Sequence, residues 1–242
     1  MQDPEQHHEL QAITLDLDDT LWPVEPVLAH ANRQLVDWLR PRAPGTAASV
    51  AANPSVLHMK GRFPGHAHDM SWLRMQLLRE TLTAQNEDVS LAEPAFEVFL
   101  EARQQVTPWP DAEPVLALWA RRYRIAAITN GNADVFRTPL APYFHASISA
   151  PAFGAAKPDP RVFLAAADAL GVPPSACLHI GDDLALDYQG ARRAGLQAAW
   201  LVRPELGGVS VVKTTSGEGL HREFHPDLWR INNVLQLGNG VA

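Results

Sequence analysis

Cysteine is almost absent from this chain, and so are the sequence marks of secretion and membrane insertion. Cys177 is the single cysteine of the 242 residues, which excludes an intramolecular disulfide and fits a reducing compartment. The first ten residues are polar and acidic, without the basic stretch and apolar run of a signal peptide. No apolar run approaches the ~20 residues that a transmembrane helix needs. We therefore expect a cytoplasmic protein with no membrane partner.

Positive charge is also scarce, because 20 lysines and arginines face 27 aspartates and glutamates, for a formal net charge of -7. A basic surface that binds nucleic acid is therefore not expected. An anionic substrate remains compatible with this balance, since a bound divalent cation can invert the local field. The shares of hydrophobic residues (46%) and charged residues (19%) are those of a globular chain. We expect a monomer or a homodimer.

Two kinds of sequence pattern divide the chain. Short apolar stretches that are typical of buried strands occur at residues 12–16, 124–129, 146–149, 177–181 and 197–202. Helical patterns occur at residues 27–39, 70–82, 91–105, 111–122, 159–170, 188–194 and 227–237. Helical patterns dominate from residue 22 to about 107, where the stretch 41–64, rich in Pro, Gly, Ala and Ser, receives no assignment.

Strands that alternate with helices predict a parallel sheet covered by helices on both faces. We therefore predict an α/β fold, with a doubly wound, Rossmann-like parallel sheet and an inserted α-helical domain. The predicted core domain comprises residues 1–21 and 108–242, and the predicted helical domain comprises residues 22–107. In such sheets the active crevice lies at the carboxyl ends of the strands, so functional residues should directly follow strands.

Polar motifs stand at four such positions, in a fixed order. They are Asp16-Leu17-Asp18-Asp19-Thr20, Thr129-Asn130-Gly131-Asn132, Lys157-Pro158, and Gly181-Asp182-Asp183 with Asp187 beyond it. Each motif alone is a weak signal, because Asp-x-Asp occurs by chance and Gly-Asp-Asp can be a turn. Their joint occurrence at strand ends or at the start of a helix indicates one shared site.

The four motifs together resemble those of the haloacid dehalogenase superfamily, and the helical insert resembles the cap domain of its first subclass. The resemblance covers essentially the whole chain. It implies that Asp16 is a nucleophile, that Asp18 is a general acid and base, and that Thr129 donates its hydroxyl to a phosphoryl oxygen. It also implies that Lys157 pairs with Asp16 and with the phosphate.

The chemistry of phosphoryl transfer agrees with this assignment, because it needs a nucleophile, charge neutralisation and a proton for the leaving group. The Asp16 carboxylate is ionised at pH 7 and can attack phosphorus without a base. Crowded carboxylates need a hard cation, and oxygen ligands favour Mg²⁺. The resemblance implies that the Asp16 carboxylate, the Asp18 carbonyl and the Asp182 carboxylate bind it, with Asp183 and Asp187 as ligands or supporting residues.

Substrate selection is expected to come from the loop after the second strand and from the insert. We predict substrate contacts for Asn130, Gly131, His68 and Arg74, while the competing interpretation of any single insert residue is a solvated polar position. A closer likeness, in residues 128–132, 178–183 and 197–200, is to bacterial phosphatases of flavin biosynthesis. Those enzymes remove phosphate from phosphoribitylamino-uracil, so the expected partner is a small phosphate ester.

Three other functions compete with a phosphatase. A phosphomutase would share the covalent step but return the phosphate to a sugar, and a non-catalytic phospho-acceptor would resemble receiver domains. A pseudoenzyme would lack a catalytic residue, and all are present here. The acid at Asp18 favours phosphate over carbon–halogen chemistry, because the resemblance implies no acid there in true dehalogenases. His179 is expected to be a hydrogen-bonded core residue, and Cys177 a small buried one.

Overall fold

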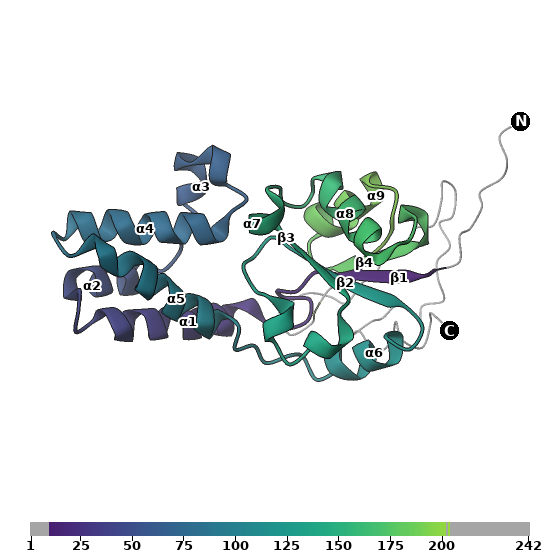
Figure 1. The fold of residues 1–242 in the computed structure, drawn as a ribbon, viewed down its shortest axis with the longest axis horizontal. Helices are drawn as coiled ribbons and strands as arrows, with labels where there is room; N and C mark the ends of the chain where they lie inside the picture. The colour runs from purple at the N-terminus through teal and green to yellow at the C-terminus, as the bar shows by residue number, and fades with distance from the viewer. Residues whose placement is uncertain (1–9, 202, 204–242) are drawn as a thin grey trace, which may run out of the picture.

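The computed structural model describes residues 10–201 and 203. Figure 1 shows a sheet covered by helices at one end of the molecule and a group of helices, α1 to α5, at the other. The helix predicted over 227–237 and the end of the strand predicted over 197–202 lie outside the described residues. No helix within the described ranges is both long and apolar enough to cross a membrane.

Within the described residues, five strands form one sheet in the order β3-β2-β1-β4-β5, and every neighbouring pair is parallel. The strands are β1 (Ala12–Leu15), β2 (Arg124–Thr129), β3 (Ala146–Ser149), β4 (Cys177–Gly181) and β5 (Gln197–Trp200). The chain runs outward from β1 to β3 and then returns to the other side of β1. This reversal between β1 and β4 is the topological switch point of a doubly wound sheet. The predicted fold class is confirmed.

Side chains of the sheet alternate between two apolar clusters, as the pleat of a strand requires. Ile13 and Leu15 belong to the cluster that contains α6 (Ala112–Trp119). Ala12 belongs to the cluster that contains α8 (Pro160–Leu170) and part of α9 (Gln189–Arg193). Figure 1 shows α6 on one face of the sheet and α8 and α9 on the other. Both faces are therefore buried, which explains the continuous apolar strands.

The inserted helices have an apolar cluster of their own, which includes Leu35, Leu39, Leu78, Leu82 and Phe99. The helices are α1 (Val24–Leu39), α2 (Pro44–Ala52), α3 (Met59–Arg62), α4 (Met70–Ala84) and α5 (Ala92–Arg103). The unassigned stretch 41–64 thus contains α2 and α3, and Pro44 opens α2 at a position where proline is favoured. The predicted domain boundaries at residues 21/22 and 107/108 stay a prediction.

Local sequence signals explain where several of these helices begin and end. The Asp69 carboxylate accepts a hydrogen bond from the Trp72 N–H at the start of α4, and Asp159 caps α8 in the same way. Gly171 ends α8 in a left-handed conformation, φ +67°. The helix predicted over 188–194 begins earlier, because a five-residue π-helix, Leu184–Tyr188, leads into α9.

Short elements complete the described structure. They are α7 (Ala150–Phe153) and the 3₁₀ turns Pro64–His66, Val89–Leu91, Val135–Arg137, Ala141–Tyr143 and Pro174–Ala176. Arg203 closes the described chain with its guanidinium buried, bonded to both carboxylate oxygens of Asp111 at 2.9 Å and to the carbonyl of Thr20. That contact fixes the loop after β1, which carries the first motif.

Candidate active site

The carboxyl ends of β1, β2 and β4 bring three of the predicted motifs together. Leu15 pairs with Ala127 of β2 and with Ile180 of β4, so the residues that follow these positions lie at one edge of the sheet. Asp16 follows β1, Thr129 ends β2, and the Asp16 N–H donates to the Ile180 carbonyl at 2.9 Å. The site therefore lies at the switch point, where parallel sheets place their ligands.

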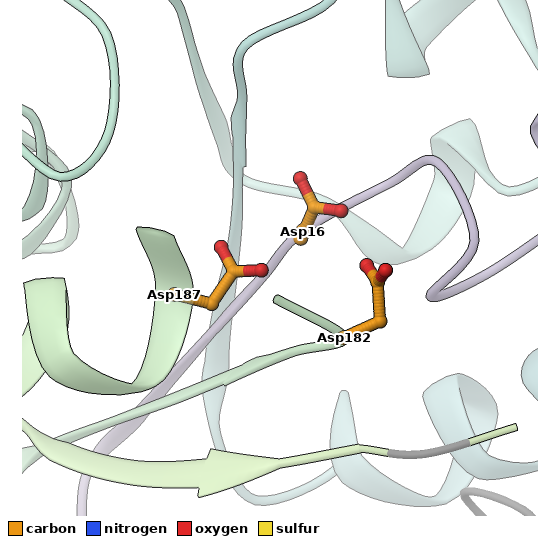
Figure 2. A group of neighbouring side chains, drawn as sticks. All are labelled: Asp16, Asp182 and Asp187. Carbon is orange, nitrogen blue, oxygen red and sulfur yellow. The ribbon is translucent and has the colours of Figure 1, made fainter. Parts of the chain in front are cut away.

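Three carboxylates meet at this edge. Figure 2 shows Asp16, Asp182 and Asp187 turned toward a common space, and one oxygen of each lies within 4.8 Å of the others. Burial raises the pKa of Asp16 well above its ordinary value; Lys157 opposes this shift, and the carboxylates of Asp187 and Asp182 add to it. The arrangement concentrates negative charge in a place with little access to water.

Lys157 supplies the cation beside Asp16. Its ammonium, 3% exposed, forms ion pairs with the Asp16 carboxylate and with Asp187 Oδ1, the latter at 2.6 Å. Burial alone would lower the pKa of Lys157, but the two carboxylates raise it above its ordinary value. Burial also opposes the ionisation of Asp187, yet Lys157 and then His179 hold the pKa of Asp187 below its usual range. Lys157 is therefore charged at neutral pH.

Asn130 positions Lys157 through the backbone. Its Oδ1 accepts from the Lys157 N–H at 2.7 Å, and its Nδ2 donates to the Lys157 carbonyl at 3.0 Å. The Asn130 side chain thus holds the Lys157 backbone, a role that sequence reasoning did not give it. The predicted substrate contact of Asn130 stays a prediction.

His179 connects this group to the interior of the sheet. Its Nε2 lies 3.2 Å from Asp187 Oδ1, and its Nδ1 lies 2.9 Å from Thr14 Oγ1 on the neighbouring strand. Burial lowers the pKa of His179, while Asp187 acts in the opposite direction. A neutral ring fits the partners, since Nε2–H donates to the carboxylate and Nδ1 accepts from the hydroxyl. The predicted core role of His179 is confirmed.

Glycine at position 181 permits the close packing of Asp187. A Cβ on Gly181 would overlap the Asp187 side chain, whose Oδ2 accepts from the Asp183 N–H at 3.0 Å. Asp183, which was predicted to bind or support the metal, binds backbone N–H groups. Its Oδ1 accepts from the N–H groups of Ala185 and Leu186, both at 2.8 Å, and it is not part of the carboxylate group. Its metal role stays a prediction.

Asp182 is held by a hydroxyl of the first motif. Thr20 Oγ1 lies 3.1 Å from Asp182 Oδ1 and 3.5 Å from Asp16 Oδ2. Burial raises the pKa of Asp182 to about 6, with the Asp187 carboxylate as the next cause. Sequence reasoning quoted Thr20 as part of the motif but gave it no role. Its position four residues after Asp16 was the available signal.

Asp18 is not part of the three-carboxylate group, and its carboxylate is bonded to Arg103 and Trp22. Its Oδ1 accepts from Arg103 Nη2 at 2.7 Å and from Trp22 Nε1 at 2.9 Å. Arg103, the last residue of α5, is 1% exposed. A Cβ on Gly131 would lie 2.8 Å from Asp18 Oδ2, so glycine permits this close approach. Sequence reasoning missed Arg103.

The other residues predicted for the site are Thr129, Arg74 and His68, and they lie in different surroundings. Thr129 is 2% exposed, and its Oγ1 accepts from the Gly131 N–H at 2.9 Å, which leaves the hydroxyl proton free to donate. Arg74, on α4, lines a cavity of about 450 Å³ that adjoins Asp18. His68 is partly exposed and does not line that cavity. Substrate contacts by His68 and Arg74 stay predictions.

The donor set fits a hard divalent cation. With Asp16, Asp182 and Asp187 ionised, three negative charges face the one positive charge of Lys157. Buried charges in proteins are paired or bind metals, and two unbalanced negative charges on oxygen donors match Mg²⁺. The arrangement therefore combines a nucleophilic carboxylate, a fixed cation and a place for a metal ion.

Comparison with known proteins identifies relatives over most of the chain. A family model for haloacid dehalogenase-like hydrolases matches residues 10–195. The 5-amino-6-(5-phospho-D-ribitylamino)uracil phosphatase YigB of Escherichia coli is 30% identical over 204 residues, which cover 82% of this chain and 85% of that protein. The phosphoserine phosphatase of Thermus thermophilus is 30% identical over 231 residues, covering 81% and 91%.

A solved structure is also similar over nearly the whole chain. The 2-haloacid dehalogenase of Pseudomonas syringae pv. tomato superimposes with a TM-score of 0.76 at 34% sequence identity, covering 96% of this chain and 97% of that one. The names of these relatives give different substrates. The substrate of this chain must therefore be argued from its own cavity.

Proposed function

Because this chain belongs to the haloacid dehalogenase-like hydrolases and is a phosphoric monoester hydrolase, we propose that Asp16 attacks the phosphorus of a small phosphorylated metabolite, with Mg²⁺ bound beside it. One observation carries this proposal. Asp16, Asp182 and Asp187 converge with Lys157 at the switch point of the sheet. That group supplies a nucleophile and the charges that phosphoryl transfer requires.

The proposed reaction proceeds in two steps. An Asp16 oxygen bonds to phosphorus, the ester P–O bond breaks, and the leaving alcohol takes a proton from Asp18. Water then attacks the aspartyl-phosphate, Asp18 accepts its proton, and inorganic phosphate leaves Asp16 as a carboxylate. Lys157 and the Thr129 hydroxyl bind phosphoryl oxygens and stabilise the charge that develops there.

The metal would be held by Asp16, Asp182 and the Asp18 backbone carbonyl, with Asp187 and Asp183 in support. When bound, it neutralises charge on the phosphoryl oxygens. Asp18 must reach the leaving oxygen, whereas its carboxylate is bonded here to Arg103 and Trp22. The proposal therefore requires that the Asp18 carboxylate exchanges part of this bonding for the leaving oxygen when substrate enters.

The proposed substrate is a small phosphate ester, and the named candidate is phosphoribitylamino-uracil. The support is the substrate printed in the name of the E. coli relative, together with the likeness of the core motifs. We further propose that the protein works in the cytoplasm, on a free metabolite rather than on nucleic acid. Its oligomeric state is proposed to be a monomer or a homodimer.

Carbon–halogen hydrolysis is the second candidate, because the similar solved structure is a 2-haloacid dehalogenase. A halide leaving group needs no proton, so the acid at Asp18 favours phosphate chemistry. Phosphate transfer to a second sugar is the further alternative. Release of inorganic phosphate at the rate of ester loss distinguishes hydrolysis from both alternatives.

A direct test uses a chromogenic aryl phosphate. With Mg²⁺ the protein should release phosphate, a chelator should stop the reaction, and Asp16→Asn should abolish turnover. Asp37→Asn is the matched control, since Asp37 is an exposed carboxylate on α1 and its loss should leave the rate unchanged. Full activity in Asp16→Asn, or chloride release from 2-chloropropionate in place of phosphate release, would refute the proposal.

A further inference from the structure

A cavity of about 450 Å³ lies between the inserted helices and the loop after β2. Its walls come from α1, from residues 54–57, from the start of α4, from the end of α5 and from Gly131 and Asn132. Asp18 also lines it. Because Asp18 is the proposed proton donor to the leaving alcohol, the cavity lies where the alcohol part of a bound ester would be.

Apolar side chains make most of the cavity wall. The larger of them include Val24, Leu28, Val56, Leu57, Met70 and Phe99. Apolar walls of this kind, in a volume between about 300 and 1,000 Å³, are typical of small-molecule sites. A two- or three-carbon alcohol is only a few times larger than a water molecule, whose share of liquid volume is about 30 Å³. Such an alcohol would leave most of the cavity unfilled.

One wall carries a buried charge without a counterion. Arg74 is 6% exposed, and its guanidinium lies 3.8 Å from the centre of the Phe99 ring. Its Nη1 donates to Asn32 Oδ1 at 3.0 Å and its Nη2 donates to the Pro54 carbonyl at 3.3 Å, and both partners are neutral. Within the described part of the chain, no carboxylate forms an ion pair with Arg74.

The guanidinium therefore retains binding capacity. Two of its five N–H groups are used by Asn32 and Pro54, so three remain without a partner among the described residues. Burial lowers the pKa of Arg74 to about 10, and the nearby Arg103 contributes to this shift. A buried arginine is costly unless its donors are satisfied. A ligand with oxygen acceptors would supply the missing partners.

Building on the proposed function, we propose that this cavity binds the alcohol part of the substrate, and that this part is a ring-sized group whose oxygen acceptors bind Arg74. Ring carbonyls and a carboxylate share one chemistry here, since both offer oxygen acceptors to the guanidinium N–H groups. The size and apolar walls of the cavity favour a ring that bears carbonyls.

Three phosphate esters separate the contributions of ring and carboxylate. Flavin mononucleotide carries ring carbonyls on a ribityl phosphate, ribitol 5-phosphate has the same chain without a ring, and 3-phosphoglycerate carries a carboxylate without a ring. We expect the wild-type protein with Mg²⁺ to prefer flavin mononucleotide over ribitol 5-phosphate in kcat/KM. In Arg74→Gln this preference should fall about ten- to a hundredfold, the range for hydrogen bonds to a charged group.

Two further variants make the test specific. Arg79→Gln is the matched control, because Arg79 lies on the same helix but is exposed and pairs with Glu93 at 3.0 Å; its preference should equal that of the wild type. Ala29→Phe places a large side chain in the cavity wall, and it too should reduce the preference. This second arm keeps the proposal testable if Arg74→Gln does not fold.

Each outcome supports or overturns a stated part of the two proposals. Loss of preference for flavin mononucleotide in both cavity variants supports a ring with carbonyls, and Arg74-dependent hydrolysis of 3-phosphoglycerate supports a carboxylate source. Hydrolysis of all three esters with no effect of Arg74→Gln or Ala29→Phe overturns the cavity proposal alone. Failure to hydrolyse any ester, the chromogenic one included, overturns the proposed function and this inference with it.

Discussion

Replacing Lys157 with methionine would remove one positive charge from the most crowded part of the site while conserving side-chain length. Lys157 is 3% exposed and pairs with Asp16 and Asp187, which are 10% and 2% exposed. Removing one partner of a buried ion pair costs about 3–5 kcal/mol, because the other charge stays buried without compensation. For a domain of this size, about 2–4 °C per kcal/mol predicts a Tm lower by about 6–20 °C.

The pH dependence follows from the same charges. In the wild type Lys157 depresses the pKa of Asp187, so that contribution to stability is present at neutral pH and is lost only as the pH falls below the usual carboxylate range. Without Lys157, burial raises the pKa of both carboxylates, and the folded state then binds more protons than the unfolded state. The stability of Lys157→Met should therefore fall as the pH rises from 5 to 8, and its deficit should be largest at pH 8.

Urea unfolding at pH 5 and pH 8, with a chelator present so that no metal compensates, measures this difference. Lys60→Met is the control, because Lys60 is exposed in α3 and a surface substitution changes stability by about 0.5 kcal/mol or less. Adding Asp187→Asn to Lys157→Met should recover part of the lost free energy of unfolding. A deficit under 1 kcal/mol, or one that is equal at both pH values, would refute the reasoning.

Two further predictions concern the proton and the metal. Asp18→Asn should lose about 10²–10⁴-fold in kcat on an alkyl phosphate and far less on a nitrophenyl phosphate, whose leaving group needs no proton; equal losses in a steady-state assay would contradict the acid role. Because burial raises the pKa of Asp182 to about 6, Asp182 takes up protons as the pH falls from 7 to 5. Protons then compete with Mg²⁺, and calorimetry should show weaker binding at pH 5 than at pH 7; a constant Kd would contradict this.

The sequence allowed the sheet and the positions of its functional residues to be predicted, because apolar strands stop sharply at polar residues. β1 ends at Leu15 and is followed by Asp16, and β4 ends at Gly181 and is followed by Asp182. The parallel fold then places these ends at one edge. Neither step needs side-chain detail, so both could be argued from pattern alone.

The side-chain contacts of the site residues could not be predicted in the same way. Arg103 meets Asp18 across 85 positions of sequence, and nothing in its helix distinguishes it from other arginines on amphipathic helices. The contact between Thr14 and His179 depends on the register of β1 against β4, which was unknown until the strands were paired. Nothing in the sequence indicated that the Asn130 carboxamide binds the Lys157 backbone, 27 positions away.

The stretch 41–64 shows a different limit. Proline and glycine there suppressed the helical signal, yet α2 begins at Pro44 and buries Thr46, Ala47 and Val50. Short helices of this kind are stabilised by packing against neighbours rather than by intrinsic propensity. Such packing is invisible until the neighbouring helices are placed.

The separate apolar cluster of α1 to α5 has a consequence for how such a protein can change over generations. Leu35, Leu78 and Phe99 pack among inserted helices, whereas Ile13 and Leu15 pack beneath the sheet. Substitutions that reshape the cavity are thus absorbed mainly by one cluster, and the strand ends that hold Asp16 and Asp182 keep their support. New selectivity can arise without rebuilding the chemistry, which is how one scaffold can serve relatives named for dissimilar molecules.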